Sequence, residues 1–298
     1  MVNNIWKEKY MTPKKIALLT DSCADLAKEE LERAHIFTVP LRICCADGEY
    51  ADGVDIQTED VYRRLHAGEL PKTSLPAGAD IHDTFARIID EGYDGVIAIM
   101  LSSGLSGTFN CVRLMAEEFS DRLTAKVFDS CSASLGQGMT LLQLAEDIEN
   151  GMGWDELVER RAPALLAGST VYFSVDTLEY LKRGGRIGKV TAAAGTLLKL
   201  KPILTFAPDG QLQSAAKVRG GSKVPDKLVE LVQAACGAHK RYNLAVVNGG
   251  APEGMETVRE KLMAVLPGCD HIWDGRIDST LSVYVGDGVL GVAVQVLD

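Results

Sequence analysis

Residues 96–108 read Val-Ile-Ala-Ile-Met-Leu-Ser-Ser-Gly-Leu-Ser-Gly-Thr. The first six are all apolar, and a run of this length without a polar residue is typical of a strand buried on both faces of a sheet. Serine and glycine then form a short loop, which leads into a predicted helix over residues 108–119. A buried strand, a small polar loop and a helix are the repeating parts of an α/β protein.

The rest of the first half continues this alternation of strand and helix. Short apolar runs predict further strands at residues 16–20, 36–43 and 125–128. Stretches of helical length and pattern predict further helices at residues 25–34, 58–67, 78–91 and 134–150. Strands that alternate with helices in this way indicate a mostly parallel sheet with helices on both faces.

The second half differs, because several predicted strands follow one another directly. Asp209-Gly210 between two apolar runs is typical of a hairpin turn. Strands are predicted at residues 171–175, 202–206, 211–218, 244–248, 272–277, 282–285 and 289–296, and helices at 177–183, 222–235 and 252–265. We therefore predict two interlocked α/β lobes, an N-terminal one over residues 1–167 with a polar extension at 1–14, and a C-terminal one over 168–298 with a mixed or antiparallel sheet. A ligand cleft is expected between them.

Composition and charge exclude several classes of protein. The 298 residues include 41 acidic and 31 basic ones, a formal net charge of −10, whereas a general nucleic-acid binder needs a basic face. No apolar run approaches the roughly 18 residues of a membrane span, and residues 1–15 contain no apolar signal-peptide core. We expect a cytoplasmic protein without stable membrane insertion.

The cysteines and histidines do not indicate a metal site. The seven cysteines are scattered without any C-x-x-C pair, and only five histidines accompany them. This pattern favours reduced, buried thiols over a disulfide framework or a zinc site. We expect neither a metal nor a cofactor.

Hydroxyl side chains follow three predicted strands at their carboxyl ends, where open α/β sheets bind ligands. Ser22 follows the strand 16–20, the loop 102–108 follows 96–101, and Ser134 ends the loop after 125–128. In the loop 102–108, Ser106 and the N–H groups around Gly107 precede a helix, and such a position can bind an anion. Ordinary capping of the helix by Ser106 or Thr108 is the alternative.

Two other polar loops are candidates for a binding site. Thr73 and Ser74 stand in Lys-Thr-Ser-Leu-Pro at residues 72–76, which on its own is typical of a helix cap or a turn. Arg186 follows a predicted helix end at Gly184-Gly185 and could pair with a carboxylate or a phosphate. A solvated basic turn between the lobes is the alternative for Arg186.

No nucleophile with a partner base is recognisable in the sequence. The serines of residues 103–107 do not have the G-x-S-x-G spacing of a hydrolase elbow, and none of the five histidines stands in a motif. Asp21 and Asp129 each end a predicted strand, where they could act as a base or cap the next helix.

Six stretches carry a resemblance over nearly the whole chain. They are LTDSCADL at 19–26, PKTSLP at 71–76, LSSGLSGT at 101–108, YLKRGGRI at 180–187, KLKPIL at 199–204 and GDGVLGV at 286–292. In this order they resemble the DegV family of fatty-acid-binding proteins, and only the first dozen or so residues fall outside the pattern.

The resemblance implies two α/β lobes that hold a long-chain fatty acid, such as palmitate, stearate or oleate, non-covalently between them. It implies no catalytic activity of the chain alone. Some bacterial members are the acyl-carrying subunits of a fatty acid kinase, so a partner subunit related to dihydroxyacetone kinases is also implied. Carried over by motif, Thr73 and Ser106 would hydrogen-bond the carboxylate, and Arg186 would lie near the pocket or the partner surface.

The chain departs from the family at three positions. Tyr284 stands where the family often has a histidine that can touch the carboxylate, Asp287 stands in place of a proline, and Leu75 in place of a glutamine. A tyrosine hydroxyl can still donate a hydrogen bond, although it supplies no positive charge. We therefore hypothesise a lipid carrier, with a hydrolase or phosphotransferase acting on a small acyl or phosphoryl substrate in the same cleft as the alternative.

Overall fold

The apolar run at residues 96–101 lies at the centre of a parallel sheet. A computed structural model describes residues 13–190 and 200–298, and in it all six residues of β6 (Gly95–Met100) are buried. β6 pairs in parallel with β1 (Ile16–Asp21) on one side and with β7 (Thr124–Asp129) on the other, and β1 pairs in parallel with β2 (Ile36–Val39). The spatial order is therefore β2-β1-β6-β7.

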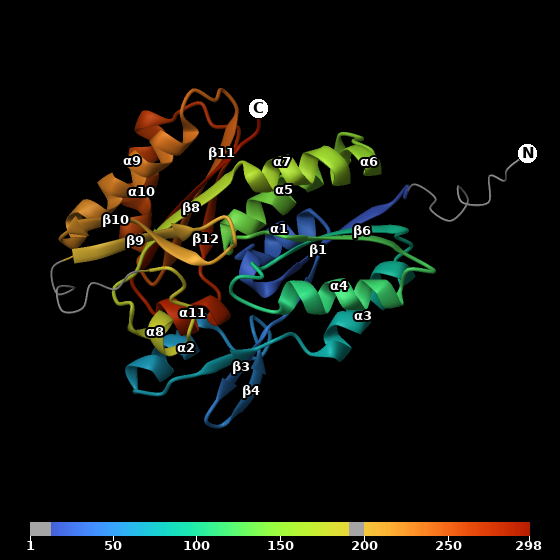
Figure 1. Cartoon of the computed structure of the whole chain (residues 1–298), viewed down its shortest axis with the longest axis horizontal. Coiled ribbons are helices and arrows are strands. Elements are labelled where there is room, and N and C mark those ends of the chain that lie inside the picture. Colours follow the sequence, from blue (N-terminus) through green and yellow to red (C-terminus); the bar gives the residue numbers. More distant parts are fainter. Residues whose placement is uncertain (1–12, 191–199) are drawn as a thin grey trace, which may run out of the picture.

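Helices cover both faces of this parallel sheet, as the fully apolar β6 requires. α3 (Gly78–Asp90) and α4 (Thr108–Glu118) pack on one face, where Phe85 of α3 is completely buried (Figure 1). α5 (Leu135–Glu149) packs on the other face, against apolar side chains of β1 and β6. The short α1 (Lys28–Arg33) lies beside β2.

A second, six-stranded sheet is formed by the later part of the chain. In spatial order its strands are β10 (Leu212–Arg219), β9 (Leu200–Phe206), β8 (Ser169–Ser174), β13 (Val289–Val296), β11 (Tyr242–Gly249) and β12 (Ile272–Arg276). All neighbours pair antiparallel except β11 and β12, which are parallel. α9 (Val224–Cys236) and α10 (Pro252–Val265) cover the outer face of this sheet (Figure 1).

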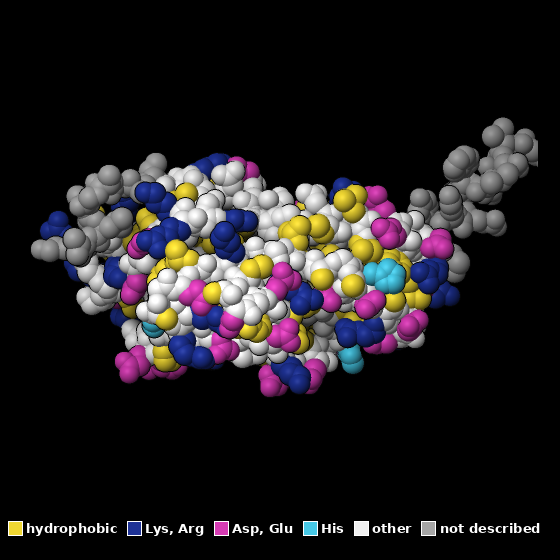
Figure 2. All heavy atoms as spheres, turned by 90° about the horizontal axis from the view of Figure 1, so that it is seen from below, with side chains coloured by type: hydrophobic (Ala, Val, Ile, Leu, Met, Phe, Trp, Pro, Cys, Tyr) yellow, Lys and Arg dark blue, Asp and Glu magenta, His cyan; other side chains and the backbone are white. Residues whose placement is uncertain are grey.

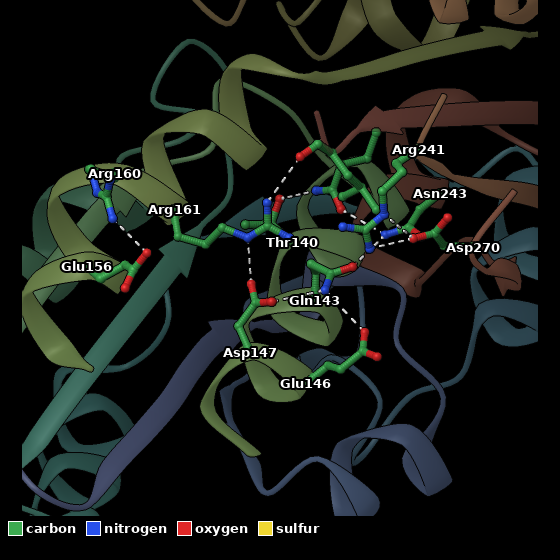
Figure 3. Close-up of polar contacts among 12 residues, drawn as sticks. Thr140, Gln143, Glu146, Asp147, Glu156, Arg160, Arg161, Arg241, Asn243 and Asp270 are labelled. Atoms are coloured by element: carbon green, nitrogen blue, oxygen red, sulfur yellow. Dashed lines mark hydrogen bonds and ion pairs between the residues drawn. The ribbon is translucent and has the colours of Figure 1, made fainter. Parts of the chain in front are cut away.

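Helix α5 lies between the two sheets and contacts strands of both. Its side facing the second sheet carries polar side chains that are paired across the contact (Figure 3). Asn243 of β11 donates to Gln143 at 2.9 Å, and Gln295 of β13 donates to the Thr140 hydroxyl at 3.0 Å. Because these groups are buried, the hydrogen bonds fix the position of α5 on the sheet.

A small third sheet and three short helices form a further part of the described structure. β3 (Arg42–Cys45) pairs antiparallel with β4 (Gly48–Ala51) and with β5 (Lys72–Ser74). α11 (Ser279–Val285) packs against β3, β5, α2 (Thr58–His66) and α8 (Glu179–Arg183), which brings residues from distant parts of the chain together (Figure 1). This cluster adjoins the second sheet, since α11 leads directly into β13.

The predicted α/β fold, with a parallel sheet followed by a mixed sheet, is confirmed. One predicted strand is wrong, because residues 282–285 belong to the helix α11. Asp278 accepts a hydrogen bond from the Leu281 N–H at 2.6 Å and so caps this helix, and Gly286, with φ of 67°, ends it. The predicted strand 36–43 is two strands, because Pro40 between them lacks the N–H that a continuous ladder needs.

Some predictions lie partly or wholly outside what the structure tests. The polar extension predicted for residues 1–14 falls mostly outside the described residues, as does Lys199 of the KLKPIL stretch. The division into lobes at residue 168 stays a prediction. A helical stretch that the sequence did not predict connects the sheets: α6 (Trp154–Glu156), a π-helical turn over Leu157–Arg161 and α7 (Ala162–Ala167).

The surface mixes acidic, basic and apolar side chains over the face drawn in Figure 2. Within residues 13–190 and 200–298, no helix is long and apolar enough to cross a bilayer. The same residues contain no group of three or more His, Cys, Asp or Glu side chains placed to hold a metal ion. All seven cysteines are described, and each is a free thiol.

Candidate functional site

A largely apolar cavity lies on the inner face of the second sheet, between α5 and α11. Its volume is about 880 Å³, which includes the space open to solvent. The lining includes residues of the strands β5, β8, β9, β10, β11 and β13. Other lining residues come from the first turn of α5, from α8 and α11, and from the loop that follows β6.

The cavity extends along β13. Val289, Gly291 and Ala293 line it at every second position, so they share the face of the strand that points toward α5. From Val289 to Ala293 the strand rises about 13 Å at roughly 3.3 Å per residue. Phe173 and Phe206 add aromatic walls, with ring centroids 6.4 Å apart. The result is an elongated apolar space with one end at α11.

Polar side chains gather at the α11 end of this cavity. Thr73 of β5 and Tyr284 of α11 both line it, and their hydroxyl oxygens lie 2.5 Å apart. Ser106 lines it from the loop before α4, and its hydroxyl lies 2.9 Å from that of Thr108. The Ser106 oxygen also accepts from the Thr108 N–H at 3.3 Å, but the N-cap residue of α4 is Gly107 and no side-chain hydrogen bond caps it, so the expected capping of α4 by Ser106 or Thr108 is not found.

Arg186 is the one charged residue among the described lining residues. Its Nε donates to the Leu105 carbonyl at 3.2 Å and its Nη1 to the Gly184 carbonyl at 2.7 Å. These bonds hold the guanidinium over the Tyr284 ring, 5.2 Å from the centroid. Gly184 allows this packing, because a Cβ there would collide with the Tyr284 ring. No carboxylate pairs with Arg186 within the described parts of the chain, which leaves donors for an anion.

The polar end adjoins a second hollow at the surface, of about 830 Å³ including open solvent. The two spaces share Thr73, Arg186 and Tyr284, and the second is also lined by Lys72 and Arg183. Three cationic side chains therefore lie around the mouth of an otherwise apolar cavity. Arg183 pairs with Glu179, whereas Lys72 and Arg186 have no carboxylate partner among the described residues, and these two favour an anionic group there.

The other predicted site residues lie in different surroundings. Ser134 lines the cavity, with φ of 58°, but its hydroxyl donates to the buried Asp25 carboxylate. Ser22, Ser74 and Gly107 are outside the lining. Ser22 accepts from the Leu41 N–H at 3.2 Å, exposed Ser74 faces away from Thr73 along β5, and Gly107 packs on Leu75. A ligand-binding role for these three stays a prediction without support from the cavity.

Buried carboxylates stand behind the wall that carries Ser134. Asp25 accepts from Ser134 and from the Asp278 N–H at 2.8 Å, and Asp52 accepts from the Thr280 N–H at 3.2 Å. Burial raises the pKa of Asp25 to about 7 and raises that of Asp278 well above its ordinary value. Burial likewise raises the pKa of Asp21 to about 6. Asp25, Asp52 and Asp278 fix the start of α11, and with it one wall of the cavity.

The lining provides no group to activate Ser106 as a nucleophile. Among the described lining residues there is no histidine, carboxylate or thiol. Asp129, a candidate base from the sequence, accepts instead from the N–H groups of Ser103 and Cys131 at 3.0 and 2.9 Å. The arrangement is suited to holding an amphipathic ligand with an anionic end.

Comparison with known proteins accounts for this architecture. The family model of DegV matches residues 15–296. The chain belongs to the DegV family. A DegV domain-containing protein of Clostridium acetobutylicum is 36% identical over 280 residues, which cover 94% of this chain and 98% of that protein.

Solved DegV structures have the same fold. A DegV family protein of Thermus thermophilus, described by its fatty acid binding, has 31% sequence identity and a TM-score of 0.88, with 95% of this chain and 100% of that chain covered. A stearic-acid-binding protein of Eubacterium ventriosum has 28% identity and a TM-score of 0.83, with 94% and 97% covered. The two-sheet arrangement described above is therefore the DegV fold.

Sequence reasoning missed one polar residue of the DegV cavity. Thr280 lines the apolar part, and no role was predicted for it because residues 282–285 were expected to form a strand. The capping residue Asp278, followed by a stretch that ends at Gly286, was the available signal for the helix that places Thr280 at the cavity.

Proposed function

We propose that this DegV-family chain binds a long-chain fatty acid, such as palmitate, stearate or oleate, non-covalently in the cavity. The observation that carries the proposal is an elongated apolar space with hydroxyl groups and one arginine at a single end. Burying an acyl chain contributes about 0.8 kcal/mol per CH₂, so about fifteen methylenes would contribute roughly 12 kcal/mol before the costs of binding.

In this proposal the carboxylate lies at the α11 end. Thr73, Ser106 and Tyr284 supply hydroxyl donors, and Arg186 supplies positive charge within the same end of the cavity. A buried carboxylate without such partners would be costly. The fatty acid binding of the proteins from Thermus thermophilus and Eubacterium ventriosum, which share this fold, supports the same ligand class here.

The proposed cavity lies between the two predicted lobes. Its lining combines residues from before residue 168, such as Leu101 and Leu135, with residues from after it, such as Val171 and Ala293. A ligand in this space would contact both halves of the chain.

We further propose that the chain presents the carboxylate to a fatty acid kinase subunit related to dihydroxyacetone kinases. The hollow lined by Lys72, Arg183 and Arg186 supports this step, because it places the carboxylate end next to the surface. Its positive charge would also favour the phosphate groups that a kinase brings to the carboxylate.

The test of binding is native mass spectrometry of the purified protein, followed by solvent extraction and lipid analysis. We expect one fatty acid per chain, and at least about a tenfold loss of affinity in a Thr73→Ala/Ser106→Ala double variant, because two donors to a charged group are removed. Ser103→Ala is the matched control, since Ser103 lies exposed in the same loop and outside the lining. A protein that takes up no added fatty acid would refute the proposal.

The kinase step is tested by incubating the stearate-loaded protein with such a kinase subunit and ATP, and by trapping acyl phosphate with hydroxylamine. We expect Arg183→Ala to slow acyl phosphate formation while stearate binding is unchanged, because Arg183 lines the hollow but not the cavity. Arg113→Ala, at an exposed position of α4, is the control. Equal rates for all three proteins would show that the hollow is not the face the kinase uses.

A further inference from the structure

Thr280, a residue of the cavity lining, carries a buried hydroxyl that has no partner among the described residues. Thr280 is 2% exposed, and its side chain lines the cavity. Its Oγ1 is completely buried and makes no hydrogen bond to any described residue. Buried polar groups in proteins are nearly always paired, so this hydroxyl requires an explanation.

The local backbone does not explain the unpaired hydroxyl. The Thr280 N–H already donates to Asp52 at 3.2 Å, so the helix start is capped without using the side chain. A valine would have nearly the same shape and would avoid the cost of burying an unsatisfied hydroxyl. The threonine is therefore useful only if something that enters the cavity completes its hydrogen bonding.

Thr280 lies deeper than the group of residues at the mouth. It stands four residues before Tyr284 in α11, so the two share one face of the helix, with about 6 Å between them along the axis. Tyr284 lines both the cavity and the cationic hollow, whereas Thr280 lines the cavity alone. In the proposed complex, Thr280 thus lies beside the chain of the fatty acid rather than beside its carboxylate.

A second hydroxyl belongs to the cavity wall on a segment linked to that of Thr280. Ser134 also lines the cavity, and the Asp25 carboxylate to which it donates also accepts from the N–H of Asp278, two residues before Thr280. The Ser134 oxygen still has lone pairs to accept a hydrogen bond. Two hydroxyls on adjoining segments therefore interrupt an otherwise apolar wall.

We propose that Thr280 recognises a polar substituent on the acyl chain, so that the cavity selects long-chain fatty acids carrying a hydroxyl group along the chain. The proposal rests on the proposed function of fatty acid binding and specifies its ligand class. A hydroxyl on the ligand can donate to the Thr280 oxygen or accept from the Thr280 O–H. Either hydrogen bond gives a partner to both the ligand hydroxyl and Thr280. An unsubstituted chain leaves Thr280 unpaired.

The test is a competition experiment followed by native mass spectrometry. Stearic acid competes with each member of a series of monohydroxystearic acids, whose hydroxyl moves stepwise from near the carboxyl group to mid-chain. The proteins are wild type, Thr280→Val, which has nearly the same shape without the hydroxyl, and Thr280→Ser, which retains it. The measured quantity is the ratio of hydroxystearate to stearate bound. Wild type and Thr280→Val form a thermodynamic cycle with the two ligands.

For at least one regioisomer we expect the ratio to fall at least about fivefold in Thr280→Val and to remain near the wild-type value in Thr280→Ser. Stearate binding itself should be unchanged or tighter in Thr280→Val. Equal ratios in wild type and Thr280→Val for every regioisomer would overturn the inference and would indicate that the hydroxyl binds only water. Weaker stearate binding by Thr280→Val would also overturn it, because the hydroxyl would then serve the carboxylate. If no protein bound stearate, the proposed function itself would fail instead.

Discussion

The hydroxyl oxygens of Thr73 and Tyr284 lie 2.5 Å apart, although 211 positions separate these residues in the chain. Thr73 is in the middle of β5, where it pairs with Ile43 of β3, and Tyr284 is near the end of α11. The third sheet and α11 therefore meet at this bond. It orients both hydroxyls at the mouth of the cavity before any ligand arrives, which lowers the entropic cost of binding.

We predict that Tyr284→Phe weakens fatty acid binding by about three- to tenfold, because a donor to the carboxylate is lost and the Thr73 hydroxyl loses the group that orients it. Titration calorimetry with stearate would measure this change. Tyr172→Phe is the control, since Tyr172 packs in the core on the other face of the second sheet. If the stearate affinity of Tyr284→Phe were unchanged, the Tyr284 hydroxyl would not bind the carboxylate, and the side chain would contribute packing only.

A second prediction concerns the length of the bound chain. Ala293 is the lining residue of β13 farthest from α11, and it is 1% exposed. Ala293→Leu would fill the space reached by the last two or three methylenes of a long acyl chain. We expect stearate affinity to fall about 30-fold relative to myristate, at about 0.8 kcal/mol per displaced CH₂.

Lipid extracts of the purified variant should accordingly contain shorter chains than those of the wild type. Val294→Leu is a suitable control, because Val294 is equally buried on the same strand but points into the core under α9 and α10. If both substitutions changed the extracted lipids alike, the effect would come from general repacking of the sheet and not from the cavity.

The first half of the fold could be predicted because each element carries its own local signal. The apolar run at residues 96–101 can only be a buried strand or part of a buried helix, and the Ser/Gly loop after it favours the strand. The hairpin at Asp209-Gly210 was predicted for the same reason, and Ala207 and Gln211 close it by hydrogen bonding. Local chemistry was sufficient for these elements.

The cavity could not be predicted from local sequence signals, because its wall is assembled from segments that lie far apart in the chain. Val171 and Val247 each look like ordinary core residues in the sequence, and only the packing of α5 against the second sheet leaves space between them. The misread segment 282–285 shows the other limit. Its alternating serine, valine and tyrosine favour a strand, but the cap at Asp278 starts a helix that tertiary packing then stabilises.

A third prediction follows from the buried Asp21, whose pKa burial raises to about 6 from 3.8. The folded protein keeps this proton at pH values where the unfolded chain has released it. The contribution of Asp21 to stability is therefore greatest below about pH 4, decreases as the pH rises to about 6, and is constant above that. Asp21→Asn removes this dependence.

Urea unfolding between about pH 4.5 and 6.5 would measure how the contribution of Asp21 to stability depends on pH. The free energy of unfolding of Asp21→Asn, relative to the wild type, should increase with pH by up to about 1.4 kcal/mol per unit. Asp155→Asn, at an exposed position of α6, serves as the control. A difference between Asp21→Asn and wild type that did not vary with pH would show that Asp21 is ionised throughout this range.

The last prediction concerns the polar contact between α5 and the second sheet. Gln295 is fully buried and donates to both Thr140 of α5 and Ser169 of β8, each at 3.0 Å, while its carbonyl accepts from Asn243 at 3.3 Å. Gln295→Leu removes the hydrogen-bond partner that Thr140, Ser169 and Asn243 share. We expect a loss of about 2–4 kcal/mol in the free energy of unfolding, measured with urea, against little change for Gln233→Leu on the exposed side of α9.

The double variant Gln295→Leu/Thr140→Val separates a hydrogen-bond effect from a packing effect. If the cost of Gln295→Leu comes from an unpaired Thr140 hydroxyl, removing that hydroxyl should recover about 1 kcal/mol or more, because replacing both partners by apolar groups is cheaper than removing one. Packing alone would make the two losses additive, since each substitution would then disturb its own surroundings. A recovery would establish that α5 is held to the sheet by paired polar groups, and that the cavity wall formed by its first turn depends on them.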